Sequence, residues 1–294
     1  MEKSIHIRKN TFAFYLFLSI SVLFTVCREV CMAGAVKGLS FCIATLIPAV
    51  FPFTVVCKLL VKAGVISRFG VISSGLVCGA PSGAYMCTEM YKNGYCTKHT
   101  AEHLCAVTNG MTPTFVIGFV GVCCLNDAQK GVFVYLICSF SSILYAFVVK
   151  KRIRITIDRA NDISVFSAFT ESVTDGISAV ISLSGFTVFF FVICEFLNTF
   201  FVFLPSHTLS FIFLFCELIT GILQSAPLCA VLSERVFFSL MCAFTSFSGI
   251  CIHLQVRGVL SRAGLSFRPF FTGKCVMAFI SFIISFIFYG IIFG

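Results

Sequence analysis

Long runs of apolar residues, separated by short polar segments, recur along the chain and limit what it can fold into. About 20 such residues cross a bilayer as a helix. Because lipid offers no partners to backbone N–H and C=O groups, spans of this length fold as helices. The sequence therefore predicts an all-α polytopic membrane protein. The runs are 11–27, 38–57, 101–125, 132–149, 176–197, 236–255 and 271–293.

Composition excludes several other classes of protein. Hydrophobic residues make up 59% of the 294 and charged residues only 11%, whereas a soluble domain carries about 25% charged residues. The net charge of +9 comes from basic residues in short loops beside apolar runs, so we expect no nucleic-acid partner. The 17 cysteines lie mostly inside apolar runs, where they act as small hydrophobes. The sequence has no P-loop and no catalytic motif, so we expect neither an enzyme nor a cofactor.

Two further apolar stretches contain too many helix-breaking residues to span comfortably. They cover 71–86 and 209–232, and we interpret both as re-entrant or broken helices. Each is followed, about 30 residues later, by a polar break inside a longer run. The four breaks are GAPSGA at 79–84, TNGMTP at 108–113, CELITG at 216–221 and TSFSG at 245–249.

The second half of the chain repeats the first. A shift of 138 residues places the segment from Gly38 over the segment from Gly176, with identities at Ser40/Ser178 and at four further positions. The same shift superimposes the breaks and the last long run of each half, which favours an internal repeat. We predict an N-terminal transmembrane helix at 1–28, taken as uncleaved, and a first repeat at 29–149. A basic cytosolic linker at 150–165 and a second repeat at 166–294 follow.

The distribution of positive charge predicts the orientation of the repeats. With the N-terminus in the cytosol, sixteen of the 21 Lys and Arg residues fall on the inside, and Lys274 at the inner end of the last helix makes seventeen. Cytoplasmic segments carry such an excess of Lys and Arg. In this arrangement 38–57 runs inward and 176–197 runs outward, so the two repeats are inverted.

Inverted repeats with interrupted helices are typical of secondary transporters. A break must face protein or a cavity, and its helix N-termini offer N–H donors to an anion. We therefore predict that the breaks converge on one polar cavity near the midplane, although small residues at such positions also serve close helix packing. Glu217 is the sharpest candidate, because an ionisable group at this depth is functional by default. The candidate substrate-binding residues are Gly79, Ser82, Gly83, Thr108, Asn109, Gly110, Thr112, Glu217, Thr220, Gly221, Ser246, Ser248 and Gly249.

A weaker pattern concerns metal binding. Cys96, His99 and His103 have a C-x2-H-x3-H spacing that places the two imidazoles on one helix face. No fourth ligand is evident in the sequence, so we interpret the segment as an interfacial polar helix and expect no metal.

Several of these segments resemble the YlbJ family of sporulation integral membrane proteins, which belongs to the nucleoside-recognition, or Gate, group related to concentrative nucleoside transporters. The resemblance implies re-entrant hairpins and solute export or import. In spore formers it implies movement of dipicolinic acid from mother cell to forespore. Tyr85 departs from the family, where a basic residue often follows the Pro-Ser-Gly-Ala motif. The similar segments are 38–53, 74–97, 108–121, 216–222 and 246–266.

These observations favour a transporter or facilitator of a small organic anion, dipicolinate-like or nucleoside-related. The alternative is a membrane gating or assembly protein that acts through protein partners and transports nothing. The expected partners are the lipid bilayer and a small organic solute. A coupling proton or cation, and assembly into a homo-oligomer, are left open. We expect the protein in the cell membrane or in a spore membrane derived from the mother cell.

The orientation gives a first testable prediction. In a cysteine-free background, Ala128→Cys is expected to react with a membrane-impermeant maleimide from outside, whereas Ile155→Cys in the basic linker reacts only after permeabilisation. The physical basis is the excess of Lys and Arg on the predicted cytosolic side. Labelling of intact cells at position 155 but not at 128 would reverse the orientation.

Overall fold

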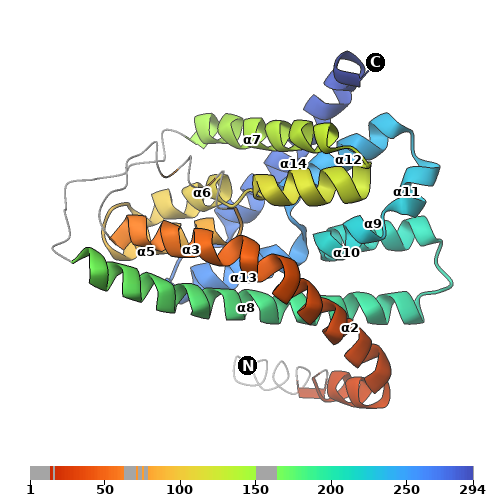
Figure 1. Ribbon diagram of the computed structural model, residues 1–294, viewed down its shortest axis with the longest axis horizontal. Coiled ribbons are helices and arrows are strands. Elements are labelled where there is room, and N and C mark those ends of the chain that lie inside the picture. Colours follow the sequence, from red (N-terminus) through yellow and green to blue (C-terminus); the bar gives the residue numbers. More distant parts are fainter. Residues whose placement is uncertain are drawn as a thin grey trace, which may run out of the picture.

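The computed structural model describes residues 14–15, 17–62, 71, 75, 79–149 and 164–293. Over these residues the chain is helical, with no β-strand (Figure 1). Five helices of this described part are long and apolar enough to cross a membrane. The prediction of an all-α polytopic membrane protein is therefore confirmed.

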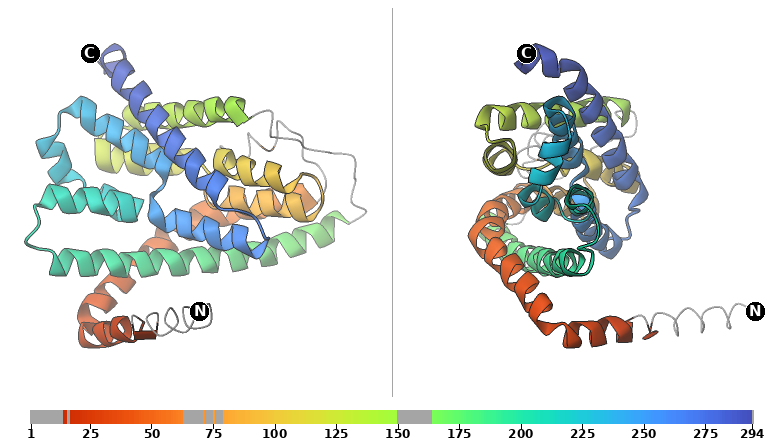
Figure 2. Two further views of the ribbon diagram at one scale, coloured as in Figure 1. Left: turned by 180° about the vertical axis from the view of Figure 1, so that it is seen from behind. Right: turned by 90° about the vertical axis from the view of Figure 1, so that its right-hand side faces the viewer.

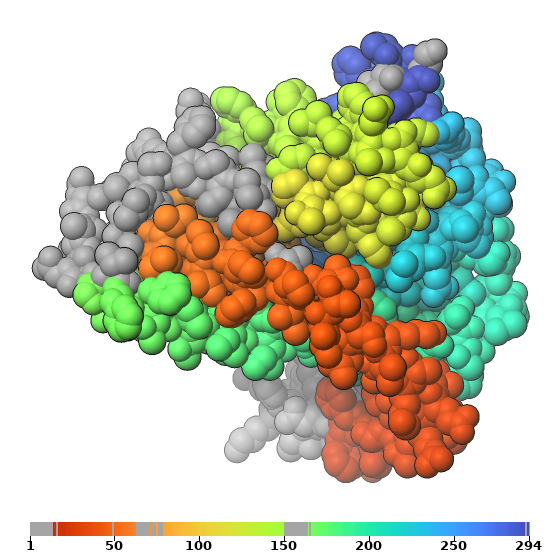
Figure 3. Space-filling view, viewed as in Figure 1, coloured from red at the N-terminus to blue at the C-terminus, as the bar shows by residue number. Residues whose placement is uncertain are grey.

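Two long antiparallel rods form one side of the molecule. The first joins α2 (Arg28–Phe41), the π-helix η1 (Cys42–Leu46) and α3 (Ile47–Lys62), and the second is α8 (Val165–Phe200). Figure 3 shows the first rod lying directly against α8. Lys37 Nζ lies 2.7 Å from Glu195 Oε2 near one end of the pair, and Lys62 Nζ lies 2.9 Å from Glu171 Oε2 near the other. The two rods therefore run in opposite directions.

Glycines let these rods approach closely. A Cβ added at Gly34 would lie 2.7 Å from Val192 Cα, and one at Gly38 would lie 2.9 Å from Val188 Cα. Helices in lipid associate through such small residues spaced four apart, because no hydrophobic effect drives them together.

The remaining helices form the body that packs on the rods (Figures 1 and 2). Each half contributes a hairpin arm, a helix that is interrupted midway and a long unbroken helix. The first half contains α5 (Ser82–Lys92), α6 (Lys98–Thr108), the π-helix η2 (Phe115–Cys124) and α7 (Ala128–Val149). The second half contains α9 (Ser206–Cys216), α10 (Leu218–Leu223), α11 (Ala226–Val231), α12 (Glu234–Phe247), α13 (Gly249–Arg262) and α14 (Arg268–Phe293).

The segment from α9 to α11 is a re-entrant hairpin. Helix α9 enters the body, the chain turns at Glu217, and α10 folds back along α9. The turn is tight because Gly221 has no side chain; a Cβ there would lie 2.4 Å from Leu214 Cα. Further out, Ser210 donates a hydrogen bond to the Gln224 carbonyl and ties the two arms together. In the first half, α5 starts from a similar central turn at 79–81, and most of 63–78 lies outside the described residues.

Contacts between the halves recur with the partners exchanged. Gly38 packs on Val188, and a Cβ added at Gly176 would lie 2.8 Å from Val55 and 3.3 Å from the ring of Phe51. The 138-residue shift maps Gly38 onto Gly176 and Val188 onto position 50, beside Phe51. Helices α7 and α14, which correspond under nearly the same shift, meet through the 2.9 Å bond from Ser281 Oγ to Ser141 Oγ. This exchange is what a two-fold axis in the membrane plane produces.

The structure describes the N-terminal segment and the linker only in part. Described residues Phe17–Val26 form an apolar helix shorter than a span, and it turns away from α2 (Figure 2). Half of the predicted span at 1–28, and all of the linker at 150–165 except its last two residues, lie outside the described residues. Lys130 forms an ion pair with Glu234, which places two segments predicted to be extracellular on the same side of the molecule.

Because α2 packs closely on α8, Gly→Ala substitutions at two positions in these helices are expected to have opposite effects on stability. Gly34→Ala is expected to destabilise the protein by about 1–3 kcal/mol, because its new methyl group meets the Val192 backbone. Gly185→Ala in α8 has open space around its Cβ and is expected to stabilise the helix by about 0.5–1 kcal/mol. Equilibrium unfolding in detergent measures both. Equal effects of the two substitutions would contradict the close approach at Gly34.

Candidate functional site

The four breaks meet near the centre of the body. The first and second are joined by the bond from Ala80 N–H to the Gly110 carbonyl, at 2.6 Å. The third and fourth are in contact at Gly249, where an added Cβ would lie 3.2 Å from Leu218 N. Within each half, the two breaks are therefore in contact with each other.

A lysine that the sequence analysis misplaced joins the two pairs. Lys274 of α14 is only 2% exposed. Its ammonium donates to the Asn109 carbonyl of the second break, and to Ser246 O at 3.2 Å and Ser248 Oγ at 3.3 Å in the fourth. The interpretation of Lys274 as a positive charge at the cytosolic end of the last helix is wrong. A lone lysine within an apolar run was the available signal, since charges at this depth face the bundle interior.

The helix ends at the breaks are sorted by polarity. Lys274 binds the C-terminal ends of α6 and α12, where unpaired carbonyls carry partial negative charge. The Phe115 N–H of η2 donates to Thr112 Oγ1 at 3.2 Å. The N-terminal turns of η2 and α13, where N–H groups carry partial positive charge, also lie at this centre. They border a cavity that we name the central cavity.

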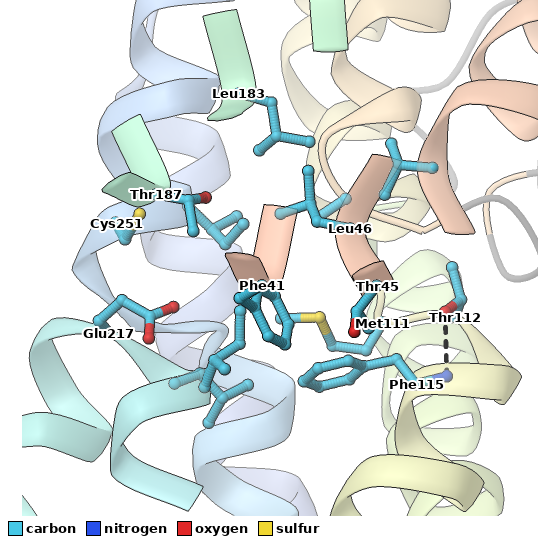
Figure 4. Close-up of a pocket in the computed structure, with 15 residues that line it drawn as sticks. Phe41, Thr45, Leu46, Met111, Thr112, Phe115, Leu183, Thr187, Glu217 and Cys251 are labelled. Atoms are coloured by element: carbon cyan, nitrogen blue, oxygen red, sulfur yellow. Dashed lines mark hydrogen bonds between the residues drawn. The ribbon is translucent and has the colours of Figure 1, made fainter. Parts of the chain in front are cut away.

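The space in the central cavity that the centres of water-sized molecules can occupy is about 70 Å³, and the cavity is partly open. Both repeats supply its walls, and the shift of 138 residues maps Thr45 onto Leu183 and Ala80 onto Leu218, all four of which line it. Figure 4 shows Phe41, Met111 and Phe115 converging on the space. The full lining is Phe41, Thr45, Leu46, Val50, Ala80, Met111, Thr112, Phe115, Leu183, Thr187, Glu217, Leu218, Ile219, Cys251 and Ile252.

Glu217 supplies the acidic group of the central cavity. It is 3% exposed, and its Oε2 accepts a 2.7 Å hydrogen bond from Thr220 N–H at the start of α10. Glu217 therefore caps the start of α10, within its own break. The titratable groups of the described chain that interact with it are the thiols of Cys42, Cys194, Cys216 and Cys251.

A smaller cavity, which we name the lysine cavity, lies on the Lys274 side of the breaks. It is bordered by Gly110 and Ser246 of the predicted site, together with Thr245 and Lys274. The Thr245 hydroxyl is buried and has no hydrogen-bond partner among the described residues. Met111 lines both cavities, so its side chain lies between them.

Other predicted residues hold the breaks together. Asn109 Oδ1 accepts from Ala84 N–H at 3.1 Å, and its Nδ2 donates to the Cys105 carbonyl at 2.6 Å. The Ser82 hydroxyl lies 2.8 Å from that of Thr54. Among the described residues that line either cavity, neither Ser82 nor Asn109 appears. We therefore assign both to positioning the breaks, whereas the sequence analysis expected them to contact solute.

The predicted glycines allow close approach at the same centre. A Cβ at Gly79 would lie 2.7 Å from Thr112 Cγ2, and one at Gly83 would lie 2.1 Å from the Thr108 carbonyl. Gly79 and Gly249 also have φ near +70°, which glycine adopts without strain. Of the thirteen predicted residues, Thr112, Glu217, Gly110 and Ser246 border a cavity. Sequence reasoning missed Thr45 and Thr187, whose hydroxyls lie on facing walls in Figure 4.

The weak metal pattern does not form a metal centre in the described chain. The rings of His99 and His103 lie with their centroids 4.5 Å apart and their planes tilted by 53°. No group of three or more His, Cys, Asp or Glu side chains that could hold a metal ion occurs among the described residues.

Comparison with known proteins gives one relevant similarity. The chain is similar to the sporulation integral membrane protein YlbJ of Bacillus subtilis strain 168, at 21% identity over 89% of this chain and 78% of that protein. No family model and no solved structure matches the chain. The name of this relative and the apolar helices agree that the chain is an integral membrane protein. The relation to nucleoside-recognition proteins stays a prediction.

The role of Asn109 gives a testable prediction. Asn109→Ala is expected to lower the free energy of unfolding by roughly 1–3 kcal/mol, because two buried hydrogen bonds are lost, one with Ala84 of the first break and one with the Cys105 carbonyl of α6. Asn198→Ala, at an exposed position of α8, is the control and should change it by less than about 0.5 kcal/mol. Unfolding equilibria in detergent measure both, and a silent Asn109 variant would refute the positioning role.

Proposed function

We propose that this protein is a secondary transporter, or a facilitator, of a small organic anion that binds in the central cavity. The observation that supports this most is that both repeats supply residues from the first turn of a helix, Phe115 of η2 and Cys251 of α13, to the wall of that cavity. Helix N-termini bind anions through free N–H groups and the positive end of the helix dipole. The membrane that holds the protein, whether that of the cell or of a developing spore, is part of the same proposal.

The N-terminus of α13 is the best-placed anion site. Its first turn carries no side-chain cap in the described structure, and Cys251 and Ile252 of that turn line the central cavity. The same kind of interaction already occurs within the chain, because the Glu217 carboxyl group accepts a hydrogen bond from an N–H group at the start of α10. A carboxylate of the solute would be bound at α13 in the same manner.

The walls of the cavity favour a flat solute with an apolar face. Phe41 and Phe115 flank the space, and the Thr45 and Thr187 hydroxyls offer hydrogen bonds from opposite sides (Figure 4). Pockets of this kind use apolar walls for affinity and a few polar groups for orientation. Dipicolinate, an aromatic ring with two carboxylates, has this chemistry and agrees with the family resemblance, and a nucleoside-related solute is the second substrate class.

Glu217 suggests how binding is coupled to protons. An ionised carboxylate in the same cavity would repel an anionic solute, and burial of two like charges is costly. The described surroundings of Glu217 supply thiols and no ammonium or guanidinium group that would balance the second charge. We therefore assign Glu217 as the group that takes up a proton when the solute binds.

Transport by purified protein in liposomes tests the proposal. Wild-type protein is expected to take up dipicolinate saturably and faster at acid pH than at alkaline pH, because Glu217 must be neutral in the loaded state. Glu217→Gln, which is always neutral, should keep uptake and lose the pH dependence. Glu195→Gln is the matched control, since Glu195 pairs with Lys37 at the end of α8.

Two negative results of this experiment would lead to different conclusions. A Glu217→Gln variant with the pH profile of wild type would exclude this carboxyl group as the proton site and leave transport standing. Vesicles that take up none of a panel of dicarboxylates and nucleosides would favour the alternative function, a gating or assembly protein that acts through protein partners.

A further inference from the structure

Lys274 occupies a setting that usually belongs to a metal cation. Its ammonium has three N–H donors, and three oxygen atoms surround it: the carbonyls of Asn109 and Ser246 and the hydroxyl of Ser248. No carboxylate forms an ion pair with it in the described structure. The charge is therefore balanced by dipoles and by the ring of Phe270, whose centroid lies 5.9 Å from the ammonium.

Those dipoles come from the two interrupted helices. The Asn109 carbonyl lies at the C-terminal end of α6, and the Ser246 carbonyl lies at the C-terminal end of α12. Unwound carbonyls and half-helix C-terminal ends are the groups that coordinate Na⁺ in membrane transporters built from inverted repeats. An uncompensated pair of helix C-termini within a bilayer needs a positive charge, since no water is present to solvate the carbonyls.

A further buried oxygen belongs to the wall of the same cavity. Thr245 is 2% exposed, lines the lysine cavity beside Lys274, and its hydroxyl has no partner in the described part of the chain. Backbone carbonyls and hydroxyls are neutral, hard ligands that suit alkali cations. The oxygen set around the ammonium is therefore complete enough to hold a small monovalent ion.

We propose that Lys274 is a tethered cation, and that its ammonium fills an oxygen site that would otherwise bind an alkali metal ion between the two interrupted helices. The site joins the second break of one repeat to the fourth break of the other through Lys274, which lies 165 residues from Asn109 in the sequence. The protein therefore holds its two halves together without Na⁺ or K⁺, and any transport through the central cavity is independent of both ions. The inference stands whether or not the solute proposed above is transported.

Removal of the ammonium tests this directly, with thermal unfolding of the full chain in neutral detergent as the readout. The melting temperature of Lys274→Ala is expected to be about 2–4 °C higher in LiCl, NaCl or KCl than in choline chloride of equal ionic strength. A rise of this size corresponds to an alkali ion at about five times its dissociation constant. Wild-type protein should show no such difference, because its site is already filled.

Two further variants identify the site. Lys274→Met removes the charge and leaves a side chain in the space, so alkali salts should not stabilise it. Lys130→Ala removes a lysine whose partner is the Glu234 carboxylate, and it should behave as wild type. Adding Ser248→Ala to Lys274→Ala takes away one oxygen ligand and should reduce the alkali-dependent rise.

The outcomes decide the proposal. Stabilisation of wild-type protein by alkali ions over choline would show that Lys274 does not fill the site. A Lys274→Ala variant with equal melting temperatures in all four salts would show that no cation site exists there. If Lys274→Ala cannot be purified in any of the four salts, Lys274→Ser, which returns one hydroxyl ligand, is measured in its place. If Lys274→Ser also cannot be purified in alkali or in choline salts, the proposal is overturned as well.

Discussion

The backbone groups released where helices are interrupted are the constraint on which the structure depends. A broken helix in lipid leaves carbonyls and N–H groups without partners, at a cost of several kcal/mol for each. At the C-terminal end of α12, three carbonyls accept hydrogen bonds from side chains. The Thr245 carbonyl accepts from Ser248 Oγ at 3.3 Å, the Ser246 carbonyl from Lys274, and the Phe247 carbonyl from the ring of His253 at 2.8 Å.

Satisfying these groups also brings the two halves together. The partners of a break come from another part of the chain: Ala80 bonds Gly110, Asn109 bonds Ala84, and Lys274 spans both repeats. The centre of the protein is consequently both its most strongly connected region and the place where helix ends are exposed to a cavity. Structural and functional demands fall on the same residues, which is why small, polar side chains gather there.

The polarity of the helix ends gives the two cavities different chemistry. Carbonyl ends face Lys274 and need positive charge, whereas N-terminal ends of η2 and α13 border the central cavity and favour negative charge. Glu217 and Lys274 therefore act in separate places, although both are buried charges near the breaks.

The sequence by itself determined the helices, the positions of the four breaks and the pairing of the two halves, because hydrophobic runs, glycines and prolines act over short distances along the chain. It also determined that Glu217 would lie deep in the protein. Only the tertiary structure decided that Asn109 and Ser82 bond to the protein, that Thr45 and Thr187 face each other across a cavity, and that Lys274 meets Asn109. Those contacts depend on how α14 and the rods lie against breaks that are far away in sequence, and apolar runs carry no information about that placement.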